Sequence, residues 1–299
     1  MEKDTRVLKA LILSDGRRGH ENQSVAFCRL LNVEYEIKHI KYKNRLYKLF
    51  SYGLDFLNIK TWKLYENEPD LENYDFAVGT GSETYYALKM LNSPVALMAP
   101  KGYKNTFFKV FINETDEYKG SNVIKMPVNF SYLKPSGYYN PIKKSIAFVI
   151  GGSNKVFQMD DEVLEKVKSI IKSFEEYETA LSTSPRTPKH IEEELKKMNF
   201  DYKVIFSENP INPLGDFAYK CEYVFITMDS VSMISELVSW GSAKIVVIPL
   251  KGRYSKFHRF VENLRNKGYL SYIEDAAHPD KKVDLKKYIN KTGLTNNKK

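Results

Sequence analysis

The sequence predicts two doubly wound α/β domains, each built on a parallel sheet. From Val7 onward, short apolar runs typical of strands buried on both faces alternate with helical patterns of apolar residues. The alternation is interrupted between Asn129 and Lys144, where proline and glycine punctuate a stretch without helix or strand period. The chain of 299 residues also has the length of two ordinary domains. We therefore expect an N-terminal domain over residues 1–135 and a C-terminal domain over residues 136–299.

The first domain is predicted to begin as a βαβ unit. An apolar run from Val7 to Leu13 indicates a strand, the apolar pattern over 25–31 indicates a helix, and residues 35–40 indicate a second strand. Further strands are expected at 76–78, 95–98, 109–112 and 123–126, with a helix over 83–91.

The second domain repeats this pattern. A strand over 145–150, a glycine-containing turn and a helix from about 160 to 174 open it. Further strands are expected at 178–183, 203–206, 223–227 and 244–249, a turn at 209–215, and helices at 188–198, 230–239 and 256–267.

The composition limits the classes of function. A formal net charge of +9 suits an anionic partner, but no zinc finger, RNA-recognition motif or basic zipper occurs, so no nucleic-acid partner is expected. Cys28 and Cys221 lie in apolar segments and are expected to be buried, reduced thiols. Neither a membrane-spanning apolar run nor a secretory signal is recognisable, which predicts a cytoplasmic protein. Because no Asp-x-Asp motif or His/Cys cluster occurs, we expect no metal and no cofactor.

Turns that follow predicted strands carry the candidate residues of the second domain. Ligands of open parallel sheets bind at the carboxyl ends of the strands. Glycines let the backbone approach a ligand and helix amides attract phosphate, so Gly151, Gly152, Ser153 and Asn154 are predicted to contact a diphosphate. The alternative is a purely structural tight turn.

The next strand end carries Ser184, Arg186 and Thr187, which offer two hydroxyls and a guanidinium. Arginine has the geometry best suited to a pair of phosphate oxygens, so these residues are also predicted to bind the nucleotide sugar. In the alternative interpretation, Thr187 only caps the helix that begins at Pro188.

A third turn opens the helix over 230–239. Asp229, Ser230 and Ser232 lie near its N-terminus, and Glu236 lies four residues after Ser232 on the same face. We expect Glu236 to accept the ribose hydroxyls while the serines and helix amides hold phosphate. The alternative is an N-cap beside an ordinary solvated glutamate.

In the first domain, Asp15 and His20 are the predicted catalytic residues. Histidine titrates near neutral pH, so His20 is suited to remove a proton from an acceptor hydroxyl, and Asp15 is the alternative base. The residues predicted to lie on the acceptor or sugar side are Gly19, Asn22, Gln23, Gly79, Thr80, Gly81, Lys256 and Arg259.

Four strings carry a resemblance to a known family: residues 15–23 (DGRRGHENQ), 184–188 (SPRTP), 227–236 (TMDSVSMISE) and 256–260 (KFHRF). Together they resemble the mitochondrial-fission, elongate-mitochondria-type family. Its bacterial members look like glycosyltransferase-B enzymes, which implies two Rossmann-like domains facing a cleft, whereas its plant members are described as adaptors in organelle division. The chain is also similar to the transferase that adds N-acetylglucosamine to a peptidoglycan lipid, which implies a UDP-sugar donor.

These observations lead to the hypothesis of a metal-independent glycosyltransferase that acts on an envelope or lipid-linked glycan. The rivals are a non-catalytic adaptor and a sugar-nucleotide epimerase or hydrolase. Residues 29–63 combine basic and aromatic side chains, which suits an anionic membrane surface and predicts peripheral attachment at the inner face of a membrane. A partly buried helix with a solvated basic side is the alternative for this segment.

Overall fold

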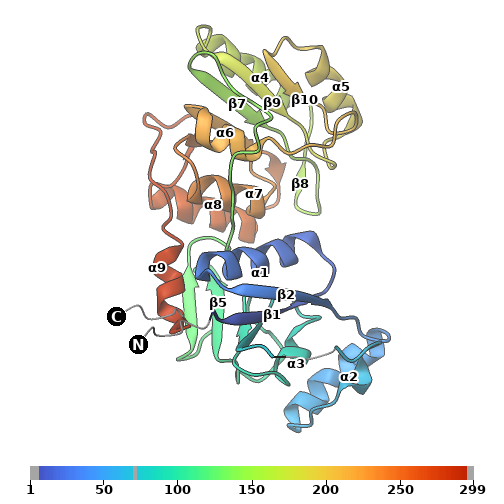
Figure 1. The fold of residues 1–299 in the computed structure, drawn as a ribbon. Coiled ribbons are helices and arrows are strands. Elements are labelled where there is room, and N and C mark those ends of the chain that lie inside the picture. Colours follow the sequence, from blue (N-terminus) through green and yellow to red (C-terminus); the bar gives the residue numbers. More distant parts are fainter. Residues whose placement is uncertain (1–6, 70–72, 295–299) are drawn as a thin grey trace, which may run out of the picture. The chain divides into compact units, whose positions relative to one another are not determined.

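The computed structural model describes residues 7–69 and 73–294, which form two compact units (Figure 1). Unit 1 comprises the described residues up to Tyr132 together with 284–294, and unit 2 is Leu133–Val283. The sequence placed all residues after 135 in the second domain, and this is wrong for the C-terminal end. The chain returns to unit 1 because α9 (Lys286–Ile289) packs on α1 (Arg18–Leu31) and buries Ile289.

Unit 1 is a parallel sheet with strand order β2-β1-β3-β4-β5-β6. Its strands are β1 (Lys9–Ser14), β2 (Glu34–His39), β3 (Phe76–Gly79), β4 (Pro94–Ala96), β5 (Lys109–Asn113) and β6 (Val123–Met126). Its other helices are α2 (Arg45–Phe56), α3 (Tyr85–Leu88) and the 3-10 turns η1 (Trp62–Leu64) and η2 (Asn290–Thr292).

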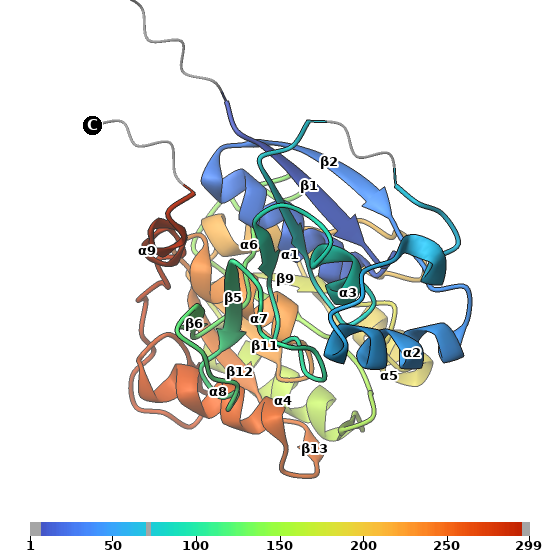
Figure 2. The same cartoon turned by 90° about the horizontal axis from the view of Figure 1, so that it is seen from below.

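Both faces of this sheet are covered, as the continuous apolar sequence of β1 requires. Leu11 and Leu13 contribute to a cluster with Tyr85 and Leu88 of α3. On the other face, Phe27 of α1 makes edge-on ring contacts with aromatic side chains of the sheet. Figure 2 shows α2 beside α3 at the periphery of unit 1.

Unit 2 is a second parallel sheet, with strand order β10-β9-β7-β11-β12-β14. Its strands are β7 (Ser145–Val149), β9 (Glu178–Ser182), β10 (Tyr202–Val204), β11 (Tyr223–Thr227), β12 (Lys244–Ile248) and β14 (Ser271–Tyr272), with the antiparallel pair β8 (Phe157–Gln158) and β13 (Lys251–Gly252). Its helices are α4 (Glu162–Ser173), α5 (Lys189–Lys197), α6 (Leu214–Lys220), α7 (Val231–Ser239) and α8 (Lys256–Asn266).

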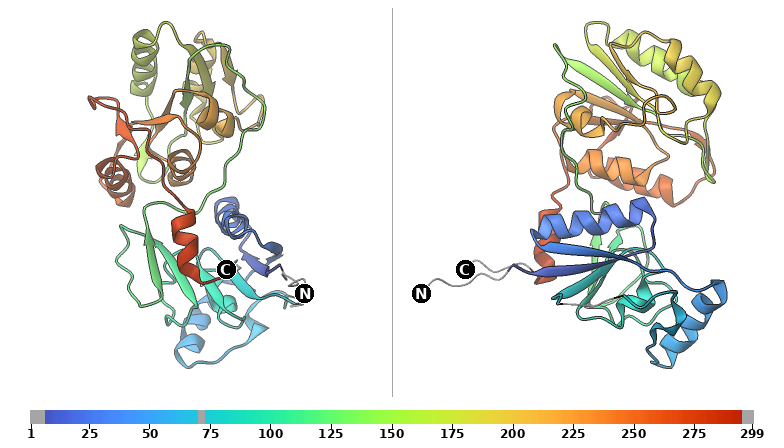
Figure 3. Two further views of the ribbon diagram at one scale, coloured as in Figure 1. Left: turned by 60° about the vertical axis from the view of Figure 1, so that its left-hand side comes forward. Right: turned by 45° about the vertical axis from the view of Figure 1, so that its right-hand side comes forward.

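Helices lie on both faces of this sheet as well (Figure 3). Val163 and Val167 of the amphipathic α4 pack with Ile146 and Phe148 of β7 in one core cluster. The prediction of two doubly wound α/β domains is therefore confirmed.

Local differences from the sequence prediction have physical reasons. The predicted turn at 209–215 ends in the first residues of α6, so Gly215 lies in a helix and not in a turn. A glycine is needed at this position because a side chain would collide with the backbone oxygen of Lys134. Cys28 and Cys221 are buried and unpaired, as expected. Of the helices within residues 7–69 and 73–294, none has the length and apolarity to cross a bilayer.

Candidate functional site

Each sheet has one topological switch point, the place where successive connections leave in opposite directions. In unit 1 it lies between β1 and β3, and in unit 2 between β7 and β11. Ligands of doubly wound sheets bind outside the carboxyl ends of the strands at such a point. The predicted residues of the turns after β1, β3, β7 and β11 are therefore at the favoured position of each unit.

At the switch point of unit 1, Asp15 and His20 form a dyad. The Asp15 carboxylate, 2% exposed, lies 2.9 Å from Nδ1 of His20, which is in the first turn of α1. Because a carboxylate accepts this bond, Nδ1 is its donor, and Nε2 is the ring nitrogen left for a substrate. Nε2 has no hydrogen-bond partner among the described residues. The dyad thus has the geometry of an oriented general base.

The turn after β3 supports the dyad from the side. Gly81 has a φ of +94°, and a Cβ there would lie 2.5 Å from Nδ1 of His20. Thr80 is buried and its hydroxyl lies 3.0 Å from that of Ser24 in α1. A Cβ on Gly79 would lie 2.8 Å from Oγ1 of Thr84. Of the three residues that were predicted to face an acceptor, Gly81 lies against the histidine ring, Thr80 joins the turn to α1, and Gly79 packs against Thr84 of its own turn.

The remaining candidates that follow β1 differ in exposure. The Gln23 amide is buried and donates to the Leu97 carbonyl oxygen at 2.8 Å, so it joins α1 to the strand end of β4. Gly19 and Asn22 are exposed at the beginning of α1. Sequence analysis overlooked Glu21, which accepts a bond from the Ser14 hydroxyl at 2.7 Å at the end of β1.

At the switch point of unit 2, the Asp229 carboxylate is the centre of a hydrogen-bond network. Its side chain is 0% exposed. One oxygen accepts a bond from the Thr227 hydroxyl at 2.7 Å, and the other accepts the Gly152 amide at 3.1 Å and Nη2 of Arg186 at 2.8 Å. Asp229 was predicted to contact the nucleotide sugar, but both of its oxygens are occupied by protein donors.

The glycines after β7 are needed for packing. A Cβ on Gly152 would lie 1.8 Å from the Arg186 carbonyl oxygen, and one on Gly151 would lie 2.2 Å from the Asp229 carboxylate. The Gly151 amide donates to Thr227 Oγ1 at 2.8 Å. Since both glycine amides have internal acceptors, the expectation that they receive a diphosphate is not supported, and the structural alternative describes them better.

Ser153 and Asn154 also make internal bonds. The Ser153 hydroxyl accepts from the Met159 amide at 3.0 Å, and the Asn154 side chain accepts from the amides of Val156 and Phe157. The chain then enters β8, and α4 begins only at Glu162. Helix α4 therefore does not follow the glycine turn directly in the chain.

The loop between β9 and α5 presents Arg186 to solvent. The Thr187 hydroxyl lies 2.6 Å from the Gly151 carbonyl oxygen and accepts the Ser184 amide at 2.9 Å, so Thr187 fastens the loop to the end of β7 and does not cap α5. The Arg186 side chain is 42% exposed while one of its nitrogens is held by Asp229. The guanidinium is thus oriented yet retains free donors.

Helix α7 begins at the same edge. Ser230 is its N-cap and accepts the Met233 amide at 3.4 Å, a long bond, and Ser232 is exposed. Glu236 is half-buried, and burial raises its pKa to about 7. Its carboxyl has no hydrogen-bond or ionic partner within the described part of the chain. An unpartnered, desolvated carboxyl is typical of a functional position.

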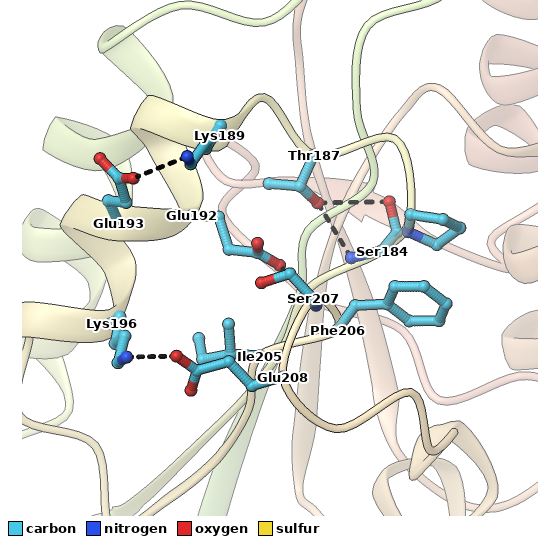
Figure 4. A pocket seen from close by; sticks show the side chains of 11 residues that line it. Ser184, Thr187, Lys189, Glu192, Glu193, Lys196, Ile205, Phe206, Ser207 and Glu208 are labelled. Carbon is cyan, nitrogen blue, oxygen red and sulfur yellow. Dashed lines mark hydrogen bonds and ion pairs between the residues drawn. The ribbon is translucent and has the colours of Figure 1, made fainter.

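A pocket of about 550 Å³ opens beside this loop (Figure 4). It is lined by Ser184 and Thr187 of the loop, by residues 205–208 after β10, and by the side chains of Lys189, Glu192, Glu193 and Lys196 of α5. Its volume is in the range of small-molecule sites. Ile205, Phe206 and Ser207 were not predicted as candidates, because they carry neither a charge nor a glycine signal in the sequence, and the charged Glu208 beside them was not predicted either.

Lys256 and Arg259 are exposed in the first turns of α8, whose N-cap is Ser255. Neither makes a hydrogen bond or ion pair to the candidate residues of the switch point within the described residues. In the same part of the chain, no group of three or more His, Cys, Asp or Glu side chains is placed to hold a metal ion. Their predicted role on the acceptor side and the predicted absence of a metal stay predictions.

Comparisons with known proteins extend these observations. The family model described as mitochondrial fission ELM1 matches residues 18–290. The uncharacterized protein RP120 of Rickettsia prowazekii (strain Madrid E) is 25% identical over 150 residues, which are 48% of this chain and 42% of that protein. The matched region is thus less than half of that relative.

Solved structures resemble the whole described fold. A putative UDP-N-acetylglucosamine 2-epimerase from Listeria monocytogenes aligns with a TM-score of 0.51 at 12% identity, over 97% of this chain and 88% of that one. The S. aureus MnaA–UDP co-structure gives 0.51 at 11% identity, over 97% and 92%. The glycotransferase of kitacinnamycin gives 0.51 at 11% identity, over 96% and 91%. These likenesses show the glycosyltransferase-B fold that the sequence predicted.

Proposed function

The chain belongs to the mitochondrial fission ELM1 family, and we propose that it is a metal-independent glycosyltransferase using a nucleotide-diphosphate sugar. The acceptor would be an envelope or lipid-linked glycan. The observation that carries the proposal is that one switch point has a candidate base and the other has candidate groups for binding a nucleotide. Within the described residues, unit 1 offers an unpartnered histidine nitrogen, and unit 2 offers an oriented guanidinium and an unpartnered carboxyl in the second turn of α7.

Donor binding is assigned to unit 2. Arg186 keeps guanidinium donors free for phosphate oxygens while Asp229 fixes its direction. The exposed Ser232 hydroxyl and the first amides of α7 add donors for the same group. Glu236 supplies an acceptor for ribose hydroxyls, and the pocket beside Ser184 gives room for the rest of the nucleotide. A UDP-sugar is favoured by the similarity to the peptidoglycan-lipid transferase.

The proposed reaction uses His20 as general base. Nε2 takes the proton of the acceptor hydroxyl, and that oxygen forms a bond to the anomeric carbon. The bond between this carbon and the phosphate oxygen breaks, and the diphosphate leaves with the electron pair. Arg186 and the N-terminus of α7 stabilise the added negative charge, which makes a divalent cation unnecessary.

The first test is calorimetric titration of the full chain with UDP, GDP, CDP and ADP and their sugars, in the presence of a chelator. One nucleotide should bind the wild type, and Arg186→Gln should weaken it about tenfold, because glutamine can still donate to Asp229 but lacks the charge. Ser232→Ala tests the helix end. Arg253→Ala, which removes an exposed arginine of the same unit, is the matched control and should bind normally.

Three outcomes would contradict the proposal or part of it. Absence of binding by every nucleotide would contradict the proposal and favour the adaptor function. Consumption of the donor without any acceptor would favour an epimerase or hydrolase. Binding that appears only when Mg²⁺ or Mn²⁺ replaces the chelator would contradict the metal-independent mechanism.

A further inference from the structure

Helix α2 directs its apolar side chains to solvent. The exposed fractions of Leu46, Leu49, Phe50, Phe56 and the following Leu57 range from 59% for Phe50 to 71% for Phe56. Their spacing places them on one face of the helix. Gly53 lies between them, and a Cβ there would meet no atom within 4 Å. A continuous apolar strip of this kind is unusual on a free surface.

The opposite, inward face of α2 combines buried polar groups with Tyr47, Tyr52 and Leu54, which pack against the core of unit 1. The Ser51 hydroxyl lies 2.8 Å from the Tyr103 hydroxyl. The Asp55 carboxylate is buried in an ion pair with Lys89 and accepts the Lys104 amide at 2.7 Å. An ordinary surface helix buries its apolar face and exposes its polar one. Because hydrogen bonds, an ion pair and these packed side chains anchor α2, the exposed apolar side chains are not needed to hold the helix and can contact something outside the chain.

The charge around this strip has one sign. From residue 41 to residue 65 the basic side chains are Lys41, Lys43, Arg45, Lys48, Lys60 and Lys63, while the acidic side chain is Asp55. Asp55 is neutralised internally by Lys89. Lys41 and Lys48 bond to Glu66 and Glu83, which leaves the exposed Lys43, Arg45, Lys60 and Lys63 beside the strip.

We propose that α2 docks on an anionic lipid bilayer, with its apolar strip in the headgroup region and its basic side chains on the lipid phosphates. Apolar residues flanked by lysine and arginine are the pattern of interfacial helices. A second copy of the chain is a poorer occupant, because two such faces would bring like charges together. The docking rests on α2 alone and does not require the proposed transferase activity.

The position of α2 gives the docking a use. Nζ of Lys48 donates to the Ser82 hydroxyl at 2.8 Å, and Ser82 follows Gly81, which packs against His20. The membrane-facing helix is thus bonded to the turn that supports the dyad. If the transferase proposal holds, a lipid-linked acceptor would reach the base from the bilayer on which α2 rests.

The test is co-sedimentation of the full chain with vesicles of phosphatidylcholine, alone or mixed with phosphatidylglycerol. The wild type should bind the anionic vesicles and lose them at high salt. Leu49→Glu/Phe50→Glu and Lys43→Gln/Arg45→Gln should each weaken binding about tenfold or more. Ile142→Glu, which changes an exposed apolar residue of unit 2, is the control and should bind as the wild type does.

All substituted side chains are exposed, so unchanged circular dichroism and thermal midpoints are expected and show that the variants fold. The proposal is overturned if the wild type ignores anionic vesicles or if both α2 variants bind them equally well. It is also overturned if the wild type is a dimer in light scattering that Leu49→Glu/Phe50→Glu dissociates, because a second copy would then cover the strip. Nucleotide titration of the same variants reports separately on the proposed function.

Discussion

The two switch points use the same topology for different purposes. In unit 1 the buried carboxylate of Asp15 orients one reactive ring, His20, and leaves its second nitrogen without a partner among the described residues. In unit 2 the buried carboxylate of Asp229 is surrounded by donors and ties the ends of β7, β9 and β11 together. A buried carboxylate after a strand therefore stabilises the surrounding loops in unit 2, whereas in unit 1 it orients the proposed base.

This difference indicates where stability and activity should respond to substitution. Substitutions around Asp229 disturb contacts between backbone segments, and these segments are too closely packed to adjust. Changes around His20 affect a partly exposed side chain that is held, within the described residues, by a single hydrogen bond, to Asp15. We expect large stability effects in unit 2 and large activity effects in unit 1.

Gly152→Ala should produce the largest loss of stability. Its Cβ would lie 1.8 Å from the Arg186 carbonyl oxygen, so two backbone segments must separate. The free energy of unfolding, measured by urea denaturation, should fall by about 3 kcal/mol. Gly137→Ala is the control within unit 2, since it has a φ of +81° but no atom within 4 Å, and should cost about 1 kcal/mol. Equal losses would show that close approach is not the reason for Gly152.

Asp229→Ala should rank next. It leaves the Gly152 amide and the Thr227 hydroxyl without their acceptor, and we expect a loss of about 2–3 kcal/mol. Asp15→Ala, measured in the same denaturation assay, should cost about 1 kcal/mol because the Arg17 amide and His20 can turn to water. A larger loss from Asp15→Ala would reverse the comparison between the two units.

Glu236 should make stability depend on pH. Burial raises its pKa from 4.5 to about 7 in the folded chain. Between these two values the folded state keeps a proton that the unfolded state has lost, so the free energy of unfolding falls as the pH rises through this window. Glu236→Gln should match the wild type below the window and be about 1–2 kcal/mol more stable above it, after allowance for partial exposure. Thermal midpoints at both ends of the window test this, and a constant difference would contradict it.

His20→Gln should change stability least, by less than about 1 kcal/mol, because a single hydrogen bond to Asp15 is lost. Its transfer activity should nevertheless fall about a hundredfold or more if His20 is the base. His39→Gln is the matched control, since His39 is an exposed histidine of unit 1 that bonds to Glu21 at 3.1 Å. Wild-type activity in the His20→Gln variant would contradict the proposal that His20 is the general base.

Local sequence patterns predicted the strands of both parallel sheets except the short β14, and they singled out the turn that carries Asp15 and His20. Continuous apolar runs marked β1 and β7 because both faces of these strands are buried. The turn after β1 identified Asp15 and His20, since residues five apart across a strand end and a helix start are brought together locally. A helix in the segment of α2 was predicted only as the alternative for residues 29–63, and its apolar face was expected to be partly buried, whereas the structure exposes it.

Contacts between distant residues account for what the sequence could not show. The Gly152 amide meets Asp229 across 77 residues of chain, and no pattern near either residue indicates that the pair would satisfy each other. The return of α9 to unit 1 depends on a contact with α1 from the other end of the chain. For the same reason, the neutral side chains after β10 became candidates only when the pocket beside Ser184 was located.

The return of the chain at Asp284 also determines the order in which the protein can mature on the ribosome. The strands of unit 1 are synthesised before unit 2, but the segment that packs on α1 is synthesised only after the whole of unit 2. Nascent unit 1 must therefore wait with an incomplete apolar surface while about half of the protein is made. Completion of unit 2 and closure of unit 1 become consecutive steps of biosynthesis, and chaperone contact is expected in the interval between them.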